Sequence, residues 1–296
     1  MVTVSVPGKI HLMGEHAVVY GKPAFLAAIN RRLTVTVEEG KSNAAGYVAD
    51  ILHIVQKHFH LRNSPDMSIS IISDIPAGYH LGSSAAVAVG VAAAVSYFLK
   101  KIWNPVLCNQ LAYEAEKIQH GNPSGADNTV VTVGGFLWYR KELEFLRSFW
   151  QLPLQLPAGL NHFSLIDTGR PKENTGEMVA IVKLRTQNSM TNMKKLFDEN
   201  EEQTKRIAVA LKKGDEKMLI DAMQKGERTL EGMGVVSKKV IPLMRSIERL
   251  GGAAKILGGG GRVAGAGYLL CYSHHPPEGS IPITLGEEGV RLETKI

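Results

Sequence analysis

An uncharged, largely apolar run from Leu81 to Leu99 constrains the fold of this chain more than any other feature of its sequence. The run barely reaches the roughly 20 residues that a membrane-spanning helix needs, and it contains three serines. We therefore interpret its Ala- and Val-rich part as a helix buried in the core of a globular protein. The first residues show neither the basic nor the apolar region of a signal peptide, so we expect a cytoplasmic protein without a membrane partner.

The composition is typical of a globular protein and favours small anionic ligands. Hydrophobic residues make up 44% of the 296 residues and charged residues 21%, which excludes a disordered chain and suggests one large domain or two modest ones. The net charge of +6 favours anionic partners. Because the basic residues are scattered and aromatic residues are only 6%, we expect a small phosphorylated or carboxylated ligand rather than nucleic acid.

Hydrophobic periodicity predicts an α+β fold with strands and helices mixed in order. The pattern is lost between Trp150 and Pro157, and a domain boundary placed there gives domains of residues 1–157 and 158–296. The predicted strands are 2–6, 33–38, 67–72, 135–139, 163–167 and 268–273, with short strands and turns after residue 276. The predicted helices are 46–60, 106–119, 175–211 (as one or two helices), 215–230 and 237–250, besides the buried one.

The segment Pro76-Ala-Gly-Tyr-His-Leu-Gly-Ser-Ser-Ala-Ala86 joins a predicted strand to a helix that starts near Ser83 or Ser84. The N–H groups at a helix start lack intrahelical acceptors and carry partial positive charge, so such a turn is suited to bind phosphate. The segment is neither a Walker A loop nor a G-x-G-x-x-G turn. The alternative is an ordinary helix start capped by a serine.

Two carboxylates flank a turn between two predicted elements. Glu116 lies near the end of a helix, and Asp127 follows a break at Gly121, Pro123 and Gly125. One carboxylate could hold Mg²⁺, which usually takes one or two protein carboxylates together with substrate phosphates, while the other orients or deprotonates a hydroxyl. The alternative is that Asp127 caps a helix and Glu116 is solvated.

Charged residues also lie in two glycine-rich stretches. Lys9, Glu15 and His16 belong to an apolar stretch just after the first predicted strand, where a buried lysine would need a partner, and Asp127 is a suitable one. The alternative is a surface lysine and a structural histidine. Gly258 to Gly261 form a run of four glycines before Arg262, which suits a phosphate-facing loop or a flexible turn.

Together these segments resemble the GHMP kinases. The motifs Pro7-Gly-Lys-x-x-Leu-x-Gly-Glu-His-Ala-Val-Val-Tyr-Gly21, the phosphate-loop segment 76–86 and His120-Gly-Asn-Pro-Ser-Gly-Ala-Asp-Asn128 fall in family order, and the last is most specific to the mevalonate branch. Weaker matches follow at Asp167-Thr-Gly169, Asn174-Thr175 and the glycine run. The resemblance spans nearly the whole chain. Because several ordered motifs rarely match by chance, it disfavours the purely structural interpretations given above for the separate segments.

The resemblance implies a ribosomal-protein-S5-like N-terminal domain and a ferredoxin-like C-terminal domain with ATP and mevalonate between them. It implies ATP-dependent phosphorylation of the 5-hydroxyl of mevalonate, in the mevalonate route to isoprenoids, with a homodimer left open. Asp127 and Lys9 would flank the acceptor hydroxyl, Ser84 and Glu116 would hold Mg²⁺, and Glu15, His16 and Thr175 would line the mevalonate side. The nucleotide-binding residues would be Gly78, His80, Leu81, Gly82, Ser83, Ser84 and Ala85.

The chain departs from the family pattern in two places. Tyr79 and His80 stand where the family usually has two small residues, and the glycine run has Leu257 before it and Arg262 inside it. His80 is expected either to donate to a phosphate oxygen or to narrow the pocket by its bulk, unless its ring points outward from the turn. The competing functions are a sibling kinase acting on phosphomevalonate, galactose or homoserine, and a nucleotide-binding regulator without catalysis.

Overall fold

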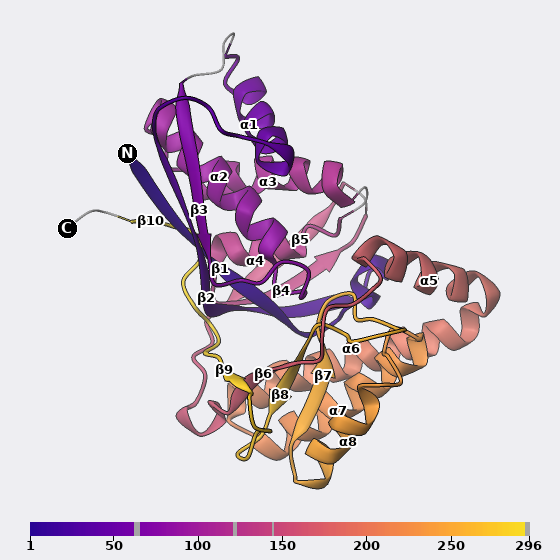
Figure 1. Ribbon diagram of the computed structural model, residues 1–296. Coiled ribbons are helices and arrows are strands. Elements are labelled where there is room, and N and C mark those ends of the chain that lie inside the picture. The colour runs from indigo at the N-terminus through magenta and orange to yellow at the C-terminus, as the bar shows by residue number, and fades with distance from the viewer. Residues whose placement is uncertain (62–65, 121–122, 144, 294–296) are drawn as a thin grey trace.

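The computed structural model describes residues 1–61, 66–120, 123–143 and 145–293, and its first half is built on a six-stranded antiparallel sheet (Figure 1). The strands run in the order β10-β1-β2-β4-β5, and β3 also pairs with β2. Their bounds are β1 Val2–Met13, β2 Pro23–Glu39, β3 Met67–Ser73, β4 Phe136–Lys141, β5 Arg147–Leu152 and β10 Arg291–Glu293. A short 3-10 helix, Ala17–Tyr20, connects β1 and β2.

The first strand is longer than the sequence predicted, and this changes the setting of Lys9. The Pro-Gly pair at residues 7 and 8 suggested a turn, whereas β1 absorbs it as an irregularity in its register with β2 and continues to Met13. Lys9 therefore lies within the strand and not after it. A strand holds its side chains in fixed alternation, so Lys9 and His11 point to the same side of the sheet.

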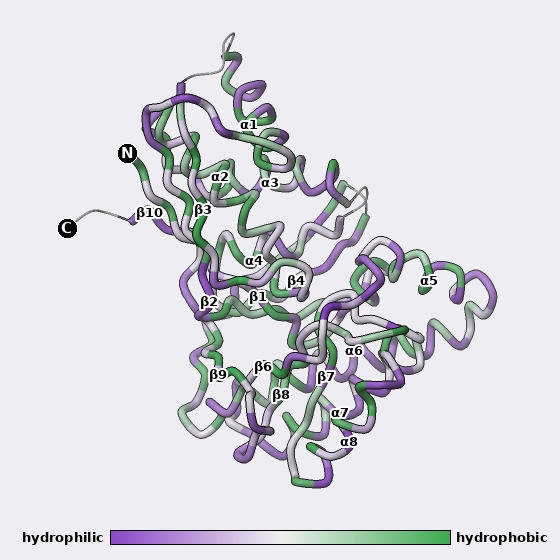
Figure 2. The backbone as a smooth tube through the Cα atoms, viewed as in Figure 1, coloured by the Kyte–Doolittle hydropathy of each residue, from purple (hydrophilic) through white to green (hydrophobic). Residues whose placement is uncertain are grey.

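Helix α2, Ser83–Lys100, confirms the interpretation of the apolar run. It is long and apolar enough to cross a membrane, but 61% of it is buried inside the structure, where it packs against β1 and β2. Figure 2 shows the apolar strands and helices of this layer in green. The other helices of the layer are α1 Gly46–His58, α3 Pro105–His120 and α4 Ala126–Val133.

The second half contains helices α5 to α8 and a smaller antiparallel sheet of order β7-β8-β6-β9, and α7 and α8 pack on β7. The predicted long helical segment is two helices, α5 Thr175–Asn188 and α6 Met190–Lys213, separated at Ser189. The remaining elements are α7 Glu216–Met233, α8 Ile241–Arg249, β6 Phe163–Asp167, β7 Ala253–Ile256, β8 Tyr268–Tyr272, β9 Ile281–Pro282 and the 3-10 helix Ala158–Leu160.

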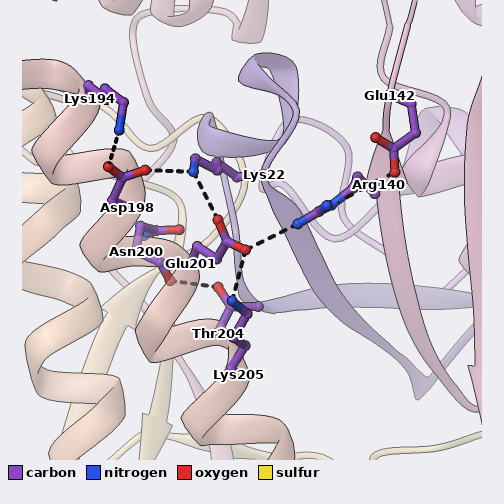
Figure 3. Close-up of polar contacts among 9 residues, drawn as sticks. All are labelled: Lys22, Arg140, Glu142, Lys194, Asp198, Asn200, Glu201, Thr204 and Lys205. Carbon is purple, nitrogen blue, oxygen red and sulfur yellow. Dashed lines mark hydrogen bonds and ion pairs between the residues drawn. The ribbon is translucent and has the colours of Figure 1, made fainter.

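Ion pairs and apolar packing join the two halves. Lys22, just before β2, lies 2.6 Å from Asp198 and 2.9 Å from Glu201 of α6, and Arg140 of β4 lies 3.1 Å from Glu201 (Figure 3). Helix α6 also packs on β1 and β2, and Ile207 of α6 belongs to the same buried cluster as the first sheet. The interface is thus partly a continuation of the core, which fixes how the two halves face each other.

Candidate active site

Lys9 and Asp127, the two residues that the sequence analysis predicted to be catalytic, form an ion pair at the centre of the site. The Nζ atom of Lys9 is 2.8 Å from Oδ2 of Asp127, and the Lys9 side chain is buried while that of Asp127 is 37% exposed. Asp127 stands in the first turn of α4, whose N-cap is Gly125. The alternative of Asp127 as a helix cap is therefore wrong, and its carboxylate faces both the lysine and solvent.

His11 completes this pair and was missed by the sequence analysis. Its Nδ1 lies 3.3 Å from Nζ of Lys9, and its Nε2 lies 3.9 Å from Oδ1 of Asp127. Burial, reinforced by the charge of Lys9, holds the pKa of His11 well below its ordinary value, so the ring is neutral. Because an ammonium only donates, Nδ1 accepts from Lys9 and the ring proton is on Nε2. The two-residue spacing on one strand could have indicated this contact.

The start of α2 brings Ser84 and Glu116 together as predicted. The Ser84 hydroxyl donates a short hydrogen bond to Oε1 of Glu116, which also accepts from the Tyr47 hydroxyl at 2.8 Å. Glu116 is buried, so the solvated alternative is wrong. A hydroxyl beside one carboxylate offers the hard oxygen ligands that Mg²⁺ takes when phosphates supply the rest, so these residues fit the ion. Within the described residues no group of three or more His, Cys, Asp or Glu could hold a metal.

The helix start is not capped by a serine side chain. The N-cap is Gly82, in a left-handed conformation, and this residue has no side chain that could bond to the first N–H groups of α2. A Cβ at Gly82 would lie 2.7 Å from Cγ of Lys9, so only glycine lets the lysine chain pass. The Leu81 carbonyl accepts from the Lys9 N–H at 3.0 Å, and Ser83 and Ala85 begin the helix. The catalytic pair and the anion-binding helix start are thus adjacent.

The glycine run lies beside the phosphate-loop turn and the His16 turn. Nε2 of His16 is 3.2 Å from the Gly259 carbonyl, and Nε2 of His80 is 3.1 Å from the Gly260 carbonyl. Burial lowers the pKa of each histidine to about 4, so both rings are neutral donors to these carbonyls. Thr175 also belongs to this cluster, because a Cβ at Gly259 would lie 3.5 Å from its Oγ1.

Glu15 is turned into the protein rather than toward the open side of the site. Its Oε1 accepts a short hydrogen bond from Nζ of Lys255 on β7, and both side chains are almost fully buried. Lys255 also donates to the carbonyls of His11, at 3.2 Å, and Ile256, at 2.6 Å. Glu227 of α7 accepts from the Ile256 N–H at 3.0 Å. A lysine inside an apolar strand was the sequence signal for this cluster, and it was not used.

One further cation borders the phosphate-loop turn. A Cβ at Gly78 would lie 2.7 Å from Nε of Arg170, which comes from the loop between β6 and α5. The sequence analysis did not single out Arg170, because a lone exposed arginine carries no pattern. Gly121 and Asn122 of the third motif lie outside the described residues, so their part in the site stays a prediction.

The architecture and these motifs are those of a GHMP kinase. Residues 46–135 match the family described as GHMP kinases N terminal domain. The fold resembles the crystal structure of L. major mevalonate kinase in complex with R-mevalonate, with a TM-score of 0.76 and 24% identity over 92% of this chain and 86% of that one. The Methanococcus jannaschii mevalonate kinase gives a TM-score of 0.75 at 23% identity, over 98% of this chain and 96% of that one.

Full-length relatives narrow the class. The mevalonate kinase of Archaeoglobus fulgidus is 31% identical over 98% of this chain and 99% of its own length. That of Thermococcus gammatolerans is also 31% identical, over 100% of this chain and 99% of its own length. The chain therefore belongs to the mevalonate kinase family, and it carries the two-domain GHMP kinase fold that its motifs implied.

Proposed function

We propose that this protein transfers the γ-phosphoryl group of ATP to the 5-hydroxyl of mevalonate, giving 5-phosphomevalonate and ADP. The observation that carries the proposal is the Lys9–Asp127 pair, 2.8 Å apart and open to solvent on the carboxylate side, next to the uncapped start of α2. This places a group that can accept a proton beside a site that can hold phosphate. The relatives of full length are mevalonate kinases, which supports mevalonate as the acceptor.

The residues would divide the work as follows. Asp127 orients the acceptor hydroxyl and takes its proton as the new P–O bond forms and the bond to the ADP oxygen breaks. Lys9 holds the Asp127 carboxylate in place and favours the developing alkoxide, while neutral His11 accepts from Lys9 and keeps its ammonium directed at the pair. A loose transition state requires little base strength, so positioning is the larger part of this contribution.

The nucleotide would lie with its phosphates at the start of α2. The turn from Gly78 to Ser84, with Leu81, Gly82 and Ala85 setting its backbone, would supply N–H donors. Ser84 and Glu116 would hold Mg²⁺, which neutralises phosphate charge when bound. His16 and Thr175 would face mevalonate, whereas Glu15 would act through its bond to Lys255 by holding the His16 turn.

We also propose that residues 1–157 and 158–296 act as two domains, supported by the two separate sheets, with β10 returning to the first sheet. A cytoplasmic location is part of the same proposal, because the one helix among the described residues that is long and apolar enough to cross a membrane, α2, is mostly buried in the core. A homodimer stays a prediction.

The test is an ADP-release assay with MgATP and four acceptors side by side: mevalonate, phosphomevalonate, galactose and homoserine. The proposal requires turnover with mevalonate well above the other three. Faster turnover with another acceptor would reassign the substrate, and ATP binding without turnover on any acceptor would instead support a regulator. Phosphorus NMR of the product then identifies the phosphorylated hydroxyl.

A further inference from the structure

Both bulky residues of the phosphate-loop turn reach across to the second half of the chain. The Tyr79 ring lies against Tyr268 of β8, with ring centroids 5.0 Å apart and an angle of 43° between the planes. The His80 ring lies against the glycine run and bonds to the Gly260 carbonyl. These two residues stand where small residues are usual in the family, and small residues could make neither contact.

The backbone of His80 is held in a conformation that histidine rarely adopts. Its φ is +65°, in the left-handed region that glycine adopts readily and asparagine tolerates, but that strains most other residues. Such strain persists only where the surroundings hold the residue in place. The turn therefore keeps a backbone suited to glycine while it carries a side chain that glycine lacks.

Glycines of the second half leave the room that the His80 ring occupies. A Cβ at Gly258 would lie 2.8 Å from Cβ of His80, and one at Gly267 would lie 3.3 Å from its Cδ2. A Cβ at Gly259 would lie 3.3 Å from its Cε1. Any larger residue at Gly258 would thus push the ring away, so the glycine run and the histidine fit each other.

The charge state of His80 sets which contact its ring makes. Burial, together with the nearby ammonium of Lys9, lowers the pKa of His80 to about 4, although the Gly260 carbonyl and the Asp127 carboxylate act in the opposite direction. The ring is neutral at pH 6 and above, and its Nε2 proton is committed to the Gly260 carbonyl. This geometry does not favour the donation to a phosphate oxygen that was one of the expectations for His80.

We propose that Tyr79 and His80 form a clasp that holds the phosphate-loop turn against the glycine run, so that the turn has its ATP-binding shape before ATP arrives. His80 is then a positioning residue that acts through the backbone of the turn. A turn ordered during folding spares the nucleotide the cost of ordering it, which strengthens binding without a new contact. The inference rests on the proposed function, because it assumes that this turn binds ATP.

The experiment compares His80→Gly, His80→Asn and Tyr79→Ala with the wild type. Calorimetric titration with a non-hydrolysable ATP analogue gives the Kd, and steady-state assays give kcat and the KM for ATP. We expect His80→Gly to weaken analogue binding and raise KM by about tenfold, with kcat within about twofold. His80→Asn should recover part of the loss, because asparagine tolerates the left-handed region and keeps an amide donor. Tyr79→Ala should show a smaller loss of the same kind.

His60→Gly is the matched control. His60 has a φ of +53°, is exposed, and follows α1 in the first half, so this variant relieves the same backbone strain away from the glycine run. Its affinity for the ATP analogue should equal that of the wild type, whatever the change in melting temperature. The melting temperatures of all variants establish that each is folded during the titration.

Three results would overturn the clasp: equal analogue affinity of His80→Gly and wild type, an equal loss in His60→Gly, or a fall in kcat at unchanged KM. Failure of the proposed function would look different. A wild type that binds the analogue but does not phosphorylate mevalonate would refute the substrate, while the analogue titrations would still decide the clasp.

Discussion

Two lysine–carboxylate pairs lie close together in this protein and differ mainly in their access to water. In the Lys9–Asp127 pair the carboxylate side chain is 37% exposed, whereas in the Lys255–Glu15 pair the side chains are 0% and 1% exposed. His11 contacts both pairs. Its backbone carbonyl accepts a hydrogen bond from Lys255, and its ring accepts one from Lys9. A lysine and a carboxylate thus form a pair that solvent can reach in one place and a fully buried pair in the other.

Access to water, and not the presence of an ion pair, therefore distinguishes the proposed catalytic carboxylate, Asp127, from the buried carboxylate of Glu15. Asp127 can meet a substrate hydroxyl, and it keeps part of its hydration when its lysine partner is lost. Glu15 cannot be hydrated in this way, because its side chain is buried. Removing its lysine partner would leave an uncompensated charge in a medium of low dielectric constant. If exposure to water separates the two pairs, substitutions in them should differ in their effects on stability and turnover, with the largest effect at the buried pair.

Lys255→Met should lower the free energy of unfolding by about 3–5 kcal/mol, because it leaves Glu15 charged and buried. Lys9→Met should cost clearly less, since Asp127 reaches water. Urea denaturation followed by circular dichroism measures both, and the double variant Lys255→Met with Glu15→Gln should regain part of the loss. Equal losses for Lys255→Met and Lys9→Met would remove the distinction between the pairs.

Asp127→Asn should reduce kcat by about 100-fold or more, because the side chain keeps its shape but loses the charge that takes or orients the proton. ATP binding should change little, whereas the unfolding free energy should fall, because the buried Lys9 ammonium loses its charged partner. Asp221→Asn is a suitable control, since Asp221 is 40% exposed and paired with Arg206 at 2.7 Å on the other half of the chain. Wild-type turnover in Asp127→Asn would exclude Asp127 as the catalytic carboxylate.

The pH dependence of the unfolding free energy should reveal the buried group formed by Glu15, Lys255 and Glu227. Burial raises the pKa of Glu227 to about 8, with Lys255 opposing and Glu231 and Glu15 adding to the shift. The folded state therefore holds a proton that the unfolded state releases above about pH 4.5, and this stabilisation is lost as the pH rises toward 8. The loss has a slope of at most about 1.4 kcal/mol per pH unit.

Glu227→Gln tests this linkage, because an amide does not titrate. The unfolding free energy of the variant minus that of the wild type should rise between pH 5 and 8 and then level off. Urea denaturation across this pH range gives the difference directly. A difference that does not vary with pH would mean that Glu227 is ionised in the folded protein.

The smallest expected effect concerns Glu116, a buried carboxylate that accepts hydrogen bonds from Ser84 and Tyr47. Glu116→Gln keeps the side-chain shape and removes one charge, so the Mg²⁺ concentration for half-maximal rate should rise about three- to tenfold. Glu114→Gln, on the same helix but exposed, serves as the control. An unchanged Mg²⁺ titration would assign Glu116 a structural role, as the acceptor of the Ser84 and Tyr47 hydrogen bonds, and not a role in holding Mg²⁺.

Much of the fold could be predicted from the sequence, because long apolar patterns report burial directly. The prediction at 163–167 coincides with β6, and the apolar run is the core helix α2. The edge strand β5 was missed because its side chains are mostly exposed and show no alternation. Strand β7 was missed because Lys255 interrupts a four-residue apolar segment, and only its distant partner Glu15 explains how it is buried.

Within the candidate site, residues inside ordered motifs could be predicted, and residues that act across the two halves could not. Lys9 with Asp127 and Ser84 with Glu116 are confirmed as neighbours. The contacts of His80 and Arg170 depend on how the second half packs against the phosphate-loop turn. That packing comes from the ion pairs of α6 and the shared core, which no local pattern encodes.

The return of β10 to the first sheet has a consequence for how the chain folds during synthesis. Thr3 of β1 pairs with Glu293 of β10, so one edge of β1 is paired only by residues that leave the ribosome after the whole second half. Until then this edge offers unpaired backbone groups to other nascent chains. The first half of the chain can thus collapse early, but its sheet is completed only when β10 emerges and pairs with β1, and this pairing ends the period in which that edge is prone to aggregate.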